Sequence, residues 1–215
     1  MAGNVVVKTS RGKQRKVPYA RLSGADQLYV DLANPPEFNL DFPKKSRQIP
    51  LPDPGPFQNK LPVMQLFDYT FGVKIKQLST GDYNHPLTVE YFAIAEEVDG
   101  DNYILLERGS DTFTPSDVTT KFHEFYGEPV RVERFATRES APLRGCKFGG
   151  HLITVTDARG KIIQHKASSA FLWDVLEDLK KIPVTRHFDR DGQRVCPPRP
   201  TEQDRPDWMR AGETP

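Results

Sequence analysis

The stretch from Leu143 to Ile182 constrains the fold more than any other part of this sequence. It contains an alternating apolar segment, GHLITVTD, then a turn with Gly160, a second extended segment, KIIQHKAS, and finally SAFLWDVLEDLKKI. Alternation with a period of two predicts strands, whereas apolar residues at helical spacing predict an amphipathic helix. We therefore expect a β-hairpin that continues into a helix over residues 169–181, which Pro183 ends.

The predicted helix has an apolar stripe that marks it as a contact element. Ser168 or Ser169 supplies its N-terminal cap, and Lys180 and Lys181 sit favourably at the negative end of its dipole. A helix with this much apolar surface must lie on a sheet or on a partner. Its candidate partner-binding residues are Phe171, Leu172, Trp173, Val175 and Leu179.

A second hairpin precedes this unit. Residues 87–97 and 102–114 alternate as strands, with Asp99 and Gly100 at the tip between them. The Asp-Gly dipeptide tolerates the positive φ of a type I′ turn. The tip lacks the ligand spacing of a calcium loop, so we interpret it as a hairpin turn.

Other strand patterns fill the middle of the chain. Residues 61–78 predict one long strand bent at Gly72, or two strands that share this glycine. Residues 128–136 predict a further strand. Between these segments, PSDVTTKFHEFYG at 115–127 predicts either a helical turn or irregular structure.

The N-terminal part combines strand patterns with a basic cluster. Residues 4–9 predict a short strand, VPYARL predicts its returning arm, and residues 27–32 alternate as a half-buried strand. A cluster of basic residues, like the one in this segment, can bind phosphate or nucleic acid by releasing counterions. It also suits a solvated arm, which we favour because Tyr19 is the one aromatic residue nearby. The basic residues are Lys8, Arg11, Lys13, Arg15, Lys16 and Arg21.

Proline and polarity set the predicted organisation. Residues 1–34 form an N-terminal hairpin and basic arm, 35–60 a Pro-rich connection, 61–183 a β-sandwich with its terminal helix, and 184–215 a mostly disordered tail. Within the connection, FNLDF at 38–42 suits an edge strand. Within the tail, FDRDGQRV suits a small hairpin, and Trp208 is a candidate for docking onto a partner.

Overall charge and hydropathy nominate no partner. Thirty basic residues against 29 acidic ones leave a net charge of +1, so no global field steers the protein toward nucleic acid or an anionic membrane. No apolar stretch is long enough to predict a membrane span. The N-terminus has valines before basic residues, the reverse of a signal peptide. We expect either a periplasmic or envelope protein whose leader was removed, or a cytoplasmic one.

The sequence contains none of the common catalytic or phosphate-binding motifs, and it predicts no catalytic, cofactor-binding or metal residue. A rival hypothesis places a small-ligand or enzyme site near Cys146, His123 and His151. His151 and His165 suggest a metal pair, but no acidic residue or cysteine at ligand spacing completes it, so we favour two polar residues in a sheet. A disulfide between Cys146 and Cys196 is allowed, and two unrelated thiols are favoured.

Residues 143–167, LRGCKFGGHLITVTDARGKIIQHKAS, together with the preceding hairpin YFAIAEEVDGDNYILLERGSDTF, carry a resemblance. In the order of strands, glycines and acidic turns they resemble a family of immunoglobulin-like, pilus-associated envelope proteins of Gram-negative bacteria. The resemblance implies a structural or interaction role at the cell envelope. It carries over no functional residue, and the helix at 169–181 departs from it.

These observations predict a mostly β protein, an immunoglobulin-like antiparallel β-sandwich with one C-terminal amphipathic helix. The alternative is an α+β arrangement with the helix packed on one face of an antiparallel sheet. The predicted function is a non-enzymatic structural or interaction module that assembles with protein partners or with itself through sheet edges and the helix. Alternatives are a nucleic-acid or phosphate-binding module that uses the basic arm, and the ligand site near Cys146.

Overall fold

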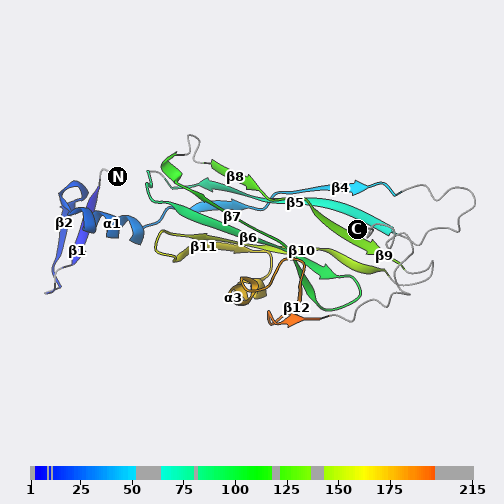
Figure 1. Cartoon of the computed structure of the whole chain (residues 1–215). Coiled ribbons are helices and arrows are strands. Elements are labelled where there is room, and N and C mark those ends of the chain that lie inside the picture. The colour runs from blue at the N-terminus through cyan, green and yellow to red at the C-terminus, as the bar shows by residue number, and fades with distance from the viewer. Residues whose placement is uncertain are drawn as a thin grey trace, which may run out of the picture.

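The computed structural model describes residues 3–8, 10, 12–51, 64–79, 82–117, 122–136 and 143–196. Among these residues, eleven strands form one continuous antiparallel sheet, and two more form a separate hairpin. The predicted mostly β, antiparallel fold is confirmed (Figure 1). The strands of the large sheet are β3 (Phe38–Asp41), β4 (Lys44–Ile49), β5 (Met64–Gln77), β6 (Leu87–Glu97), β7 (Tyr103–Phe113), β8 (Phe122–Tyr126), β9 (Val130–Phe135), β10 (Arg144–Thr156), β11 (Ile162–Ala167), β12 (His187–Phe188) and β13 (Arg194–Val195).

One part of the sheet is built around β5. Strands β3 and β4 both pair with β5, and the register is the same for the two strands. Phe42 and Pro43 separate β3 from β4. Proline has no backbone N–H to donate, but the Pro43 carbonyl still accepts a hydrogen bond from Gly72 at 3.1 Å. Strands β8 and β9 also pair with β5, with an interruption between them where Gly127 donates to the Phe71 carbonyl. The predicted strand through Gly72 is therefore one continuous strand.

The other part of the sheet is built around β10. This strand pairs with β6 over ten residue pairs, and with β11 at its far end. Strand β7 follows β6, and β12 and β13 follow β7. At its start β10 pairs with β9 through Arg144 and Gly145, which makes the sheet continuous. The two parts face one another around a core that includes Phe71, Tyr91 and Ile153.

Strand β6 is buried on both faces from Tyr91 to Ala95, which explains its run YFAIA. Val89, Tyr91 and Ala93 point into the core between the two parts of the sheet. Phe92 and Ile94 point the other way, into a second cluster beneath the C-terminal helices. A strand covered on both faces loses the apolar–polar alternation of a strand with one wet face.

The helices of the second cluster are α2 (Ala170–Asp174) and α3 (Leu176–Leu179), so the single predicted helix over 169–181 needs correction. Val175 separates them with φ −98° and ψ 14°, outside the usual helical range. Leu172, Val175 and Leu179 are all buried with residues of β6 and β7. These three candidate partner-binding residues are covered by the sheet, so they offer no exposed surface to a partner. The helices are thus packed on one face of the antiparallel sheet, as in the alternative α+β arrangement.

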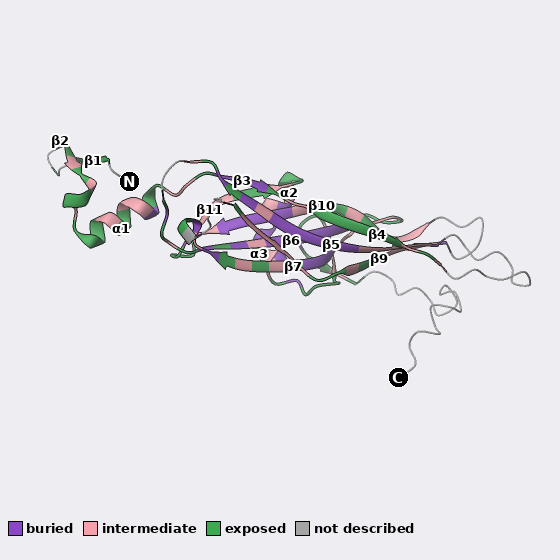
Figure 2. Cartoon of the chain, turned by 90° about the horizontal axis from the view of Figure 1, so that it is seen from above, coloured by how far each residue is buried: buried purple, intermediate pink, exposed green. Residues whose placement is uncertain are grey.

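The N-terminal unit, residues 3–34, projects from one end of the sheet (Figures 1 and 2). A hairpin is present as predicted, formed by β1 (Asn4–Lys8) and β2 (Gln14–Pro18). Its returning arm was predicted at residues 17–22 but lies at 14–18, and a 3₁₀ turn, η1 (Tyr19–Arg21), follows. The strand predicted at 27–32 is wrong, since α1 (Gly24–Ala33) is a helix. Ser23 caps it by accepting a hydrogen bond from the Asp26 amide at 3.2 Å.

Three further segments agree with the sequence patterns only in part. The proposed connection over 35–60 contains β4 as well as the edge strand foreseen at 38–42. In the described residues of the segment 115–127, where a helical turn or irregular structure was foreseen, a 3₁₀ turn, η2 (Pro115–Asp117), and strand β8 are present. In the proposed tail 184–215 the described residues run to Cys196, and there β12 and β13 form the foreseen small hairpin. Trp208 lies outside the described residues.

Candidate functional site

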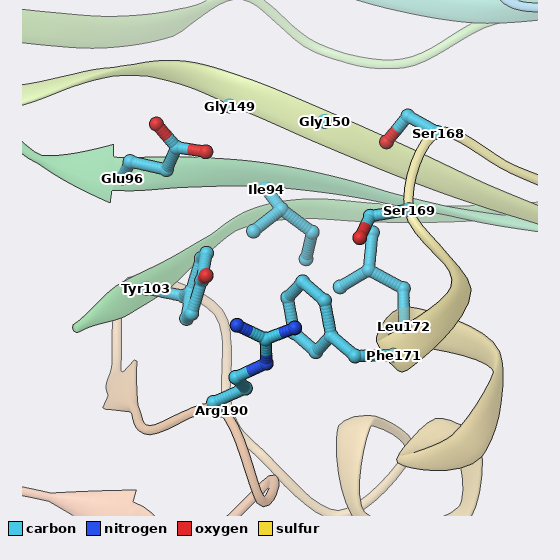
Figure 3. A pocket seen from close by; sticks show the side chains of 10 residues that line it. All are labelled: Ile94, Glu96, Tyr103, Gly149, Gly150, Ser168, Ser169, Phe171, Leu172 and Arg190. Atoms are coloured by element: carbon cyan, nitrogen blue, oxygen red, sulfur yellow. The ribbon is translucent and has the colours of Figure 1, made fainter. Parts of the chain in front are cut away.

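A small pocket opens between the start of α2, the middle of β10 and the turn that joins β12 to β13 (Figure 3). Its volume is about 110 Å³, enough for a few water-sized groups. The residues that line it are Ile94, Glu96, Tyr103, Gly149, Gly150, Ser168, Ser169, Phe171, Leu172 and Arg190.

Two glycines in β10 make room for this pocket. The β6–β10 register shifts between Phe148 and Gly150, so Gly149 bulges out of the ladder. A Cβ atom at Gly149 would lie 2.5 Å from Cγ of Glu96. A side chain at either glycine would therefore fill the pocket or displace a wall, because a Cβ atom at Gly150 would also meet the Ser168 hydroxyl.

The pocket's upper edge is held by Ser168. Its hydroxyl accepts a hydrogen bond from the His151 amide at 2.8 Å and donates to the His151 carbonyl at 3.2 Å. This reciprocal pair continues the β10–β11 ladder by one side chain. It fixes the point at which the chain leaves the sheet and enters α2.

The polar groups of the pocket have different environments. The Glu96 carboxylate pairs with Lys147 at 3.3 Å. The Arg190 guanidinium lies over the Phe171 ring, 5.7 Å from its centroid, and the Tyr103 ring packs on the same phenylalanine at 4.8 Å. Figure 3 shows Glu96 and Arg190 on separate walls. The lining residues of the pocket include one carboxylate, one guanidinium and three hydroxyl groups, but no nucleophile held by a base.

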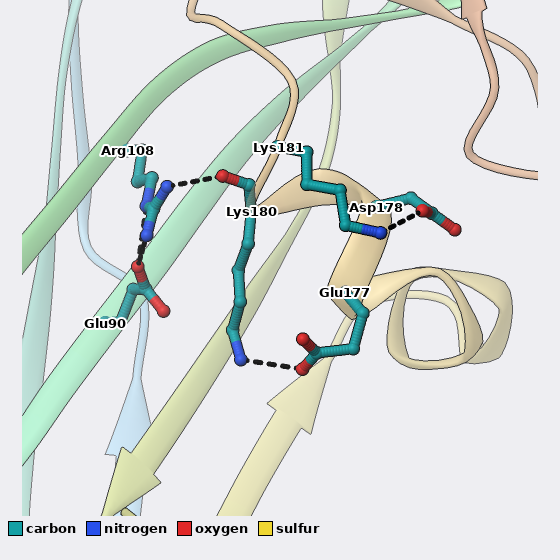
Figure 4. Close-up of polar contacts among 6 residues, drawn as sticks. All are labelled: Glu90, Arg108, Glu177, Asp178, Lys180 and Lys181. Atoms are coloured by element: carbon teal, nitrogen blue, oxygen red, sulfur yellow. Dashed lines mark hydrogen bonds and ion pairs between the residues drawn. The ribbon is translucent and has the colours of Figure 1, made fainter.

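The end of α3 is tied to the sheet (Figure 4). Arg108 on β7 donates from Nε to Glu90 at 2.6 Å and from Nη1 to the Lys180 carbonyl at 2.9 Å. Lys180 and Lys181 pair with Glu177 and Asp178 within the helical segment. Arg108 thus satisfies a carbonyl that the end of a helix leaves without a partner.

The three residues of the rival site do not form a catalytic arrangement. Burial raises the pKa of the Cys146 thiol, which disfavours the reactive thiolate. His123 bonds Asp111 at 2.9 Å and stacks on Phe113. Burial lowers the pKa of His151 to about 4, helped by the charge of Lys166. Within the described part of the chain, no contact joins any two of the three.

The suggested histidine pair is also separated. The His151 ring stacks on Phe42, with centroids 4.4 Å apart. The His165 ring stacks on Trp173, with centroids 3.6 Å apart, on the outer side of the hairpin. In the described residues no group of three His, Cys, Asp or Glu side chains is placed to hold a metal ion. Cys146 and Cys196 are both free thiols, so they form no disulfide.

A buried carboxyl group that the sequence patterns do not reveal lies between β7 and the β8–β9 junction. Glu107 is 9% exposed and lies beside the fully buried Tyr91 and Gly127. Burial raises the pKa of Glu107, although the neighbouring Tyr91 hydroxyl partly opposes this, and burial also raises the pKa of Tyr91. Nothing in the alternation of β7 marks this residue, because glutamate at a strand position normally faces water.

The N-terminal unit is the second candidate site. Of its described residues only Leu32 is buried, whereas Val6, Leu28 and Tyr29 are 53%, 46% and 71% exposed (Figure 2). The predicted basic residues Lys8, Lys13, Arg15 and Lys16 are exposed on its hairpin, and Arg11 lies outside the described residues. In the ladder Lys16 lies opposite Val6 and Arg15 opposite Val7, so these two basic side chains point to opposite faces of the hairpin.

Polar contacts attach the N-terminal unit to the sheet. Asp31 on α1 accepts a hydrogen bond from the Tyr19 hydroxyl at 2.7 Å and lies 3.3 Å from Nε2 of His85. Arg159, in the β10–β11 turn, donates to the Leu32 carbonyl at 2.8 Å and to Asp157 at 2.6 Å. Burial alone would raise the pKa of Asp157, but hydrogen bonds from Arg159 and Lys161 lower it overall.

Three comparisons place the chain among known proteins only weakly. No family model matches it, and no curated protein is similar to it. A crystal structure from Akkermansia muciniphila is similar over 63% of this chain and 73% of that chain, at 14% identity and a TM-score of 0.25. A similarity of this size carries no argument about function. In the described residues no helix is long and apolar enough to cross a membrane.

Proposed function

We propose that this protein is a non-enzymatic structural or interaction module associated with a pilus or another part of the cell envelope. Its main contact surface is the N-terminal unit. The observation that carries this proposal is the exposure of that unit: of its described residues only Leu32 is buried, while Val6, Leu28 and Tyr29 lie open. A two-stranded hairpin is at best marginally stable alone in water. A partner would bury this surface and stabilise the hairpin.

The attachment of the unit supports the same role. Tyr19, Asp31 and His85 form one polar contact, and Arg159 forms another. These contacts orient the unit while leaving its apolar residues uncovered. A segment that is oriented but not packed is suited to contact another molecule.

The chemistry of the interior supports a non-enzymatic role. The Cys146 thiol has a raised pKa, and the His151 ring is stacked against Phe42 with a lowered pKa. Neither group suits acid–base or nucleophilic work near neutral pH. The envelope part of the proposal rests on the resemblance of residues 143–167 to pilus-associated proteins. Fractionation of cells that produce the protein tests it, and recovery in the cytoplasm alone would contradict it.

Site-specific photo-crosslinking in producing cells tests the contact surface. A photoreactive residue replaces Tyr29, which is 71% exposed on α1, and a control replaces Val184, which is 43% exposed beyond α3. We expect a discrete protein adduct from position 29, identified by mass spectrometry, and none from position 184. Adducts from neither position would contradict the proposed function.

The basic hairpin supports one further candidate, a nucleic-acid-binding module. Lys8, Arg15 and Lys16 are exposed on a narrow two-stranded ribbon, and such ribbons can enter a nucleic-acid groove. This candidate predicts salt-sensitive binding to duplex DNA or to RNA that disappears when Lys13, Arg15 and Lys16 become alanine. Binding that is absent, or that does not depend on salt, would exclude it.

A further inference from the structure

The N-terminal segment and the rest of the chain carry net charges of opposite sign. Residues 1–34 contain six basic and two acidic residues, a net charge of +4. Since the whole chain has a net charge of +1, the remainder carries −3. The N-terminal hairpin is therefore basic relative to the body to which it is attached.

The tip of the β6–β7 hairpin carries acidic residues, of which Glu96 pairs with Lys147 and the two aspartates have no basic partner among the described residues. Glu96, Glu97, Asp99 and Asp101 lie within six residues of one another, and both aspartates are exposed. The turn between β12 and β13 lies beside this tip because Phe188 pairs with Tyr103 and His187 contacts Glu97 at 3.3 Å. That turn adds Asp189 and Asp191, with Arg190 between them.

The basic and acidic ends lie far apart in one molecule. Strand β6 begins at Leu87, near the His85 contact with the N-terminal unit, and it ends at Glu97. A strand rises about 3.3 Å per residue, so the length of β6 alone separates the two ends by roughly 30 Å. Figure 1 shows the N-terminal unit at one end and the β6–β7 tip pointing away from it. The hairpin therefore cannot contact the acidic tip of its own chain.

We propose that the β1–β2 hairpin of one copy docks on the β6–β7 tip of a second copy, so that the protein associates head to tail. This inference rests on the proposed function and names the partner of the N-terminal unit. Complementary charges set the orientation, and the exposed side chain of Val6, which is 53% accessible and lies opposite Lys16 in the ladder, supplies apolar contact. A two-fold symmetric pairing of hairpins would oppose like charges. The contact is heterologous and leaves one free end of each kind, so it can propagate.

Charge reversal at both ends tests the proposal. The first variant carries Asp99→Lys and Asp101→Lys in the exposed tip, and the second carries Lys8→Glu, Arg15→Glu and Lys16→Glu. Sedimentation velocity at rising protein concentration measures association, and circular dichroism checks that each variant folds. We expect the wild type to associate at low salt and to dissociate at high salt. Each variant alone should associate more than about tenfold more weakly.

The mixture of the two variants is the decisive sample. The basic hairpin of the first meets the acidic tip of the second, and the acidic hairpin of the second meets the basic tip of the first. We expect mixing to restore association, and the chain with all five reversals to associate by itself. Failure of the mixture to associate, or wild-type association unchanged by either variant, would overturn the head-to-tail contact.

Two other outcomes separate this inference from the proposed function. If position 29 crosslinks to a different protein and the purified chain stays monomeric at every concentration, the head-to-tail contact is wrong and the interaction role stands. If the hairpin variant loses binding to duplex DNA while both variants remain monomeric like the wild type, the partner is a nucleic acid, and the contact between copies is overturned.

Discussion

The side chain of Gln164 on β11 bonds both backbone polar groups of Phe38 on β3. Its Oε1 accepts from the Phe38 amide at 3.0 Å, and its Nε2 donates to the Phe38 carbonyl at 2.6 Å. One amide side chain thus does what a neighbouring strand would do for β3. It joins the edges of the two parts of the sheet where no backbone ladder is present in the described residues.

Replacing Gln164 with alanine should open this edge. Both polar groups of Phe38 lose their partner, and an unsatisfied, partly buried pair costs about 1–3 kcal/mol of unfolding free energy. Urea unfolding measures the change as a shift of midpoint at constant slope. Asn39 is an exposed residue of β3, the strand that carries Phe38. Asn39→Ala is the matched control and should change stability by no more than about 0.5 kcal/mol. Equal effects of the two changes would contradict the role given to Gln164.

Leu172 tests whether α2 covers the sheet. Leu172 is 1% exposed, whereas Leu28 on α1 is 46% exposed. We expect Leu172→Ala to cost about 2–5 kcal/mol because it leaves a cavity above β6, and Leu28→Ala to cost less than about 1 kcal/mol. Thermal and urea unfolding measure both. A small loss at Leu172 would mean that the helix is not packed as described.

His151 should make stability depend on pH. Its pKa is lowered to about 4 in the folded protein by burial, whereas an unfolded histidine titrates near 6.5. The folded state therefore favours the neutral ring, so its stability is complete above pH 6.5 and falls as the pH drops toward 4. At pH 5 the loss from this group is about 2 kcal/mol.

The variant His151→Phe should lack this part of the pH dependence. Urea unfolding at pH 7 and pH 5 measures it as the difference between variant and wild type. Val155→Ala, a buried apolar change on the same strand, is the control and should cost the same at both pH values. An equal difference between His151→Phe and wild type at both pH values would contradict the prediction.

Arg159 should control how firmly α1 is held. Arg159→Ala removes the hydrogen bond to the Leu32 carbonyl and the main partner of the buried Asp157. We expect faster hydrogen exchange across residues 24–33 and a loss of about 1–3 kcal/mol in global stability. Arg47→Ala, which breaks an exposed pair with Asp68, should cost less than about 1 kcal/mol and leave α1 unchanged. If exchange in α1 does not change, Arg159 does not hold it.

The hairpins were predictable from sequence because their signals are local. The turn at Gly160 has a positive φ of 80°, as a glycine turn allows. At Gly100 the predicted position of the hairpin is confirmed, but its φ is not in the positive region, so the predicted type I′ turn is wrong. A Cβ atom at Gly100 would meet the Glu97 carboxylate, which would have to move aside.

The errors arose where tertiary contacts outweigh local pattern. The alternation of Leu28, Val30 and Leu32 imitates a strand, but the cap at Ser23 and the contacts of Asp31 select a helix. Strand β4 has no apolar alternation, since five of its six residues are exposed. It forms because β5 presents an unpaired edge. The contacts of Gln164 and the burial of Glu107 depend on distant segments, so no sequence pattern reveals them.

The ten-pair ladder between β6 and β10 has a mechanical consequence. Both strands run lengthwise from the end that carries the N-terminal unit toward the β6–β7 tip (Figure 1). Tension applied between these two ends would slide the strands past each other instead of unzipping them one bond at a time. The hydrogen bonds then share the force, so the body is built to transmit a pull along its length.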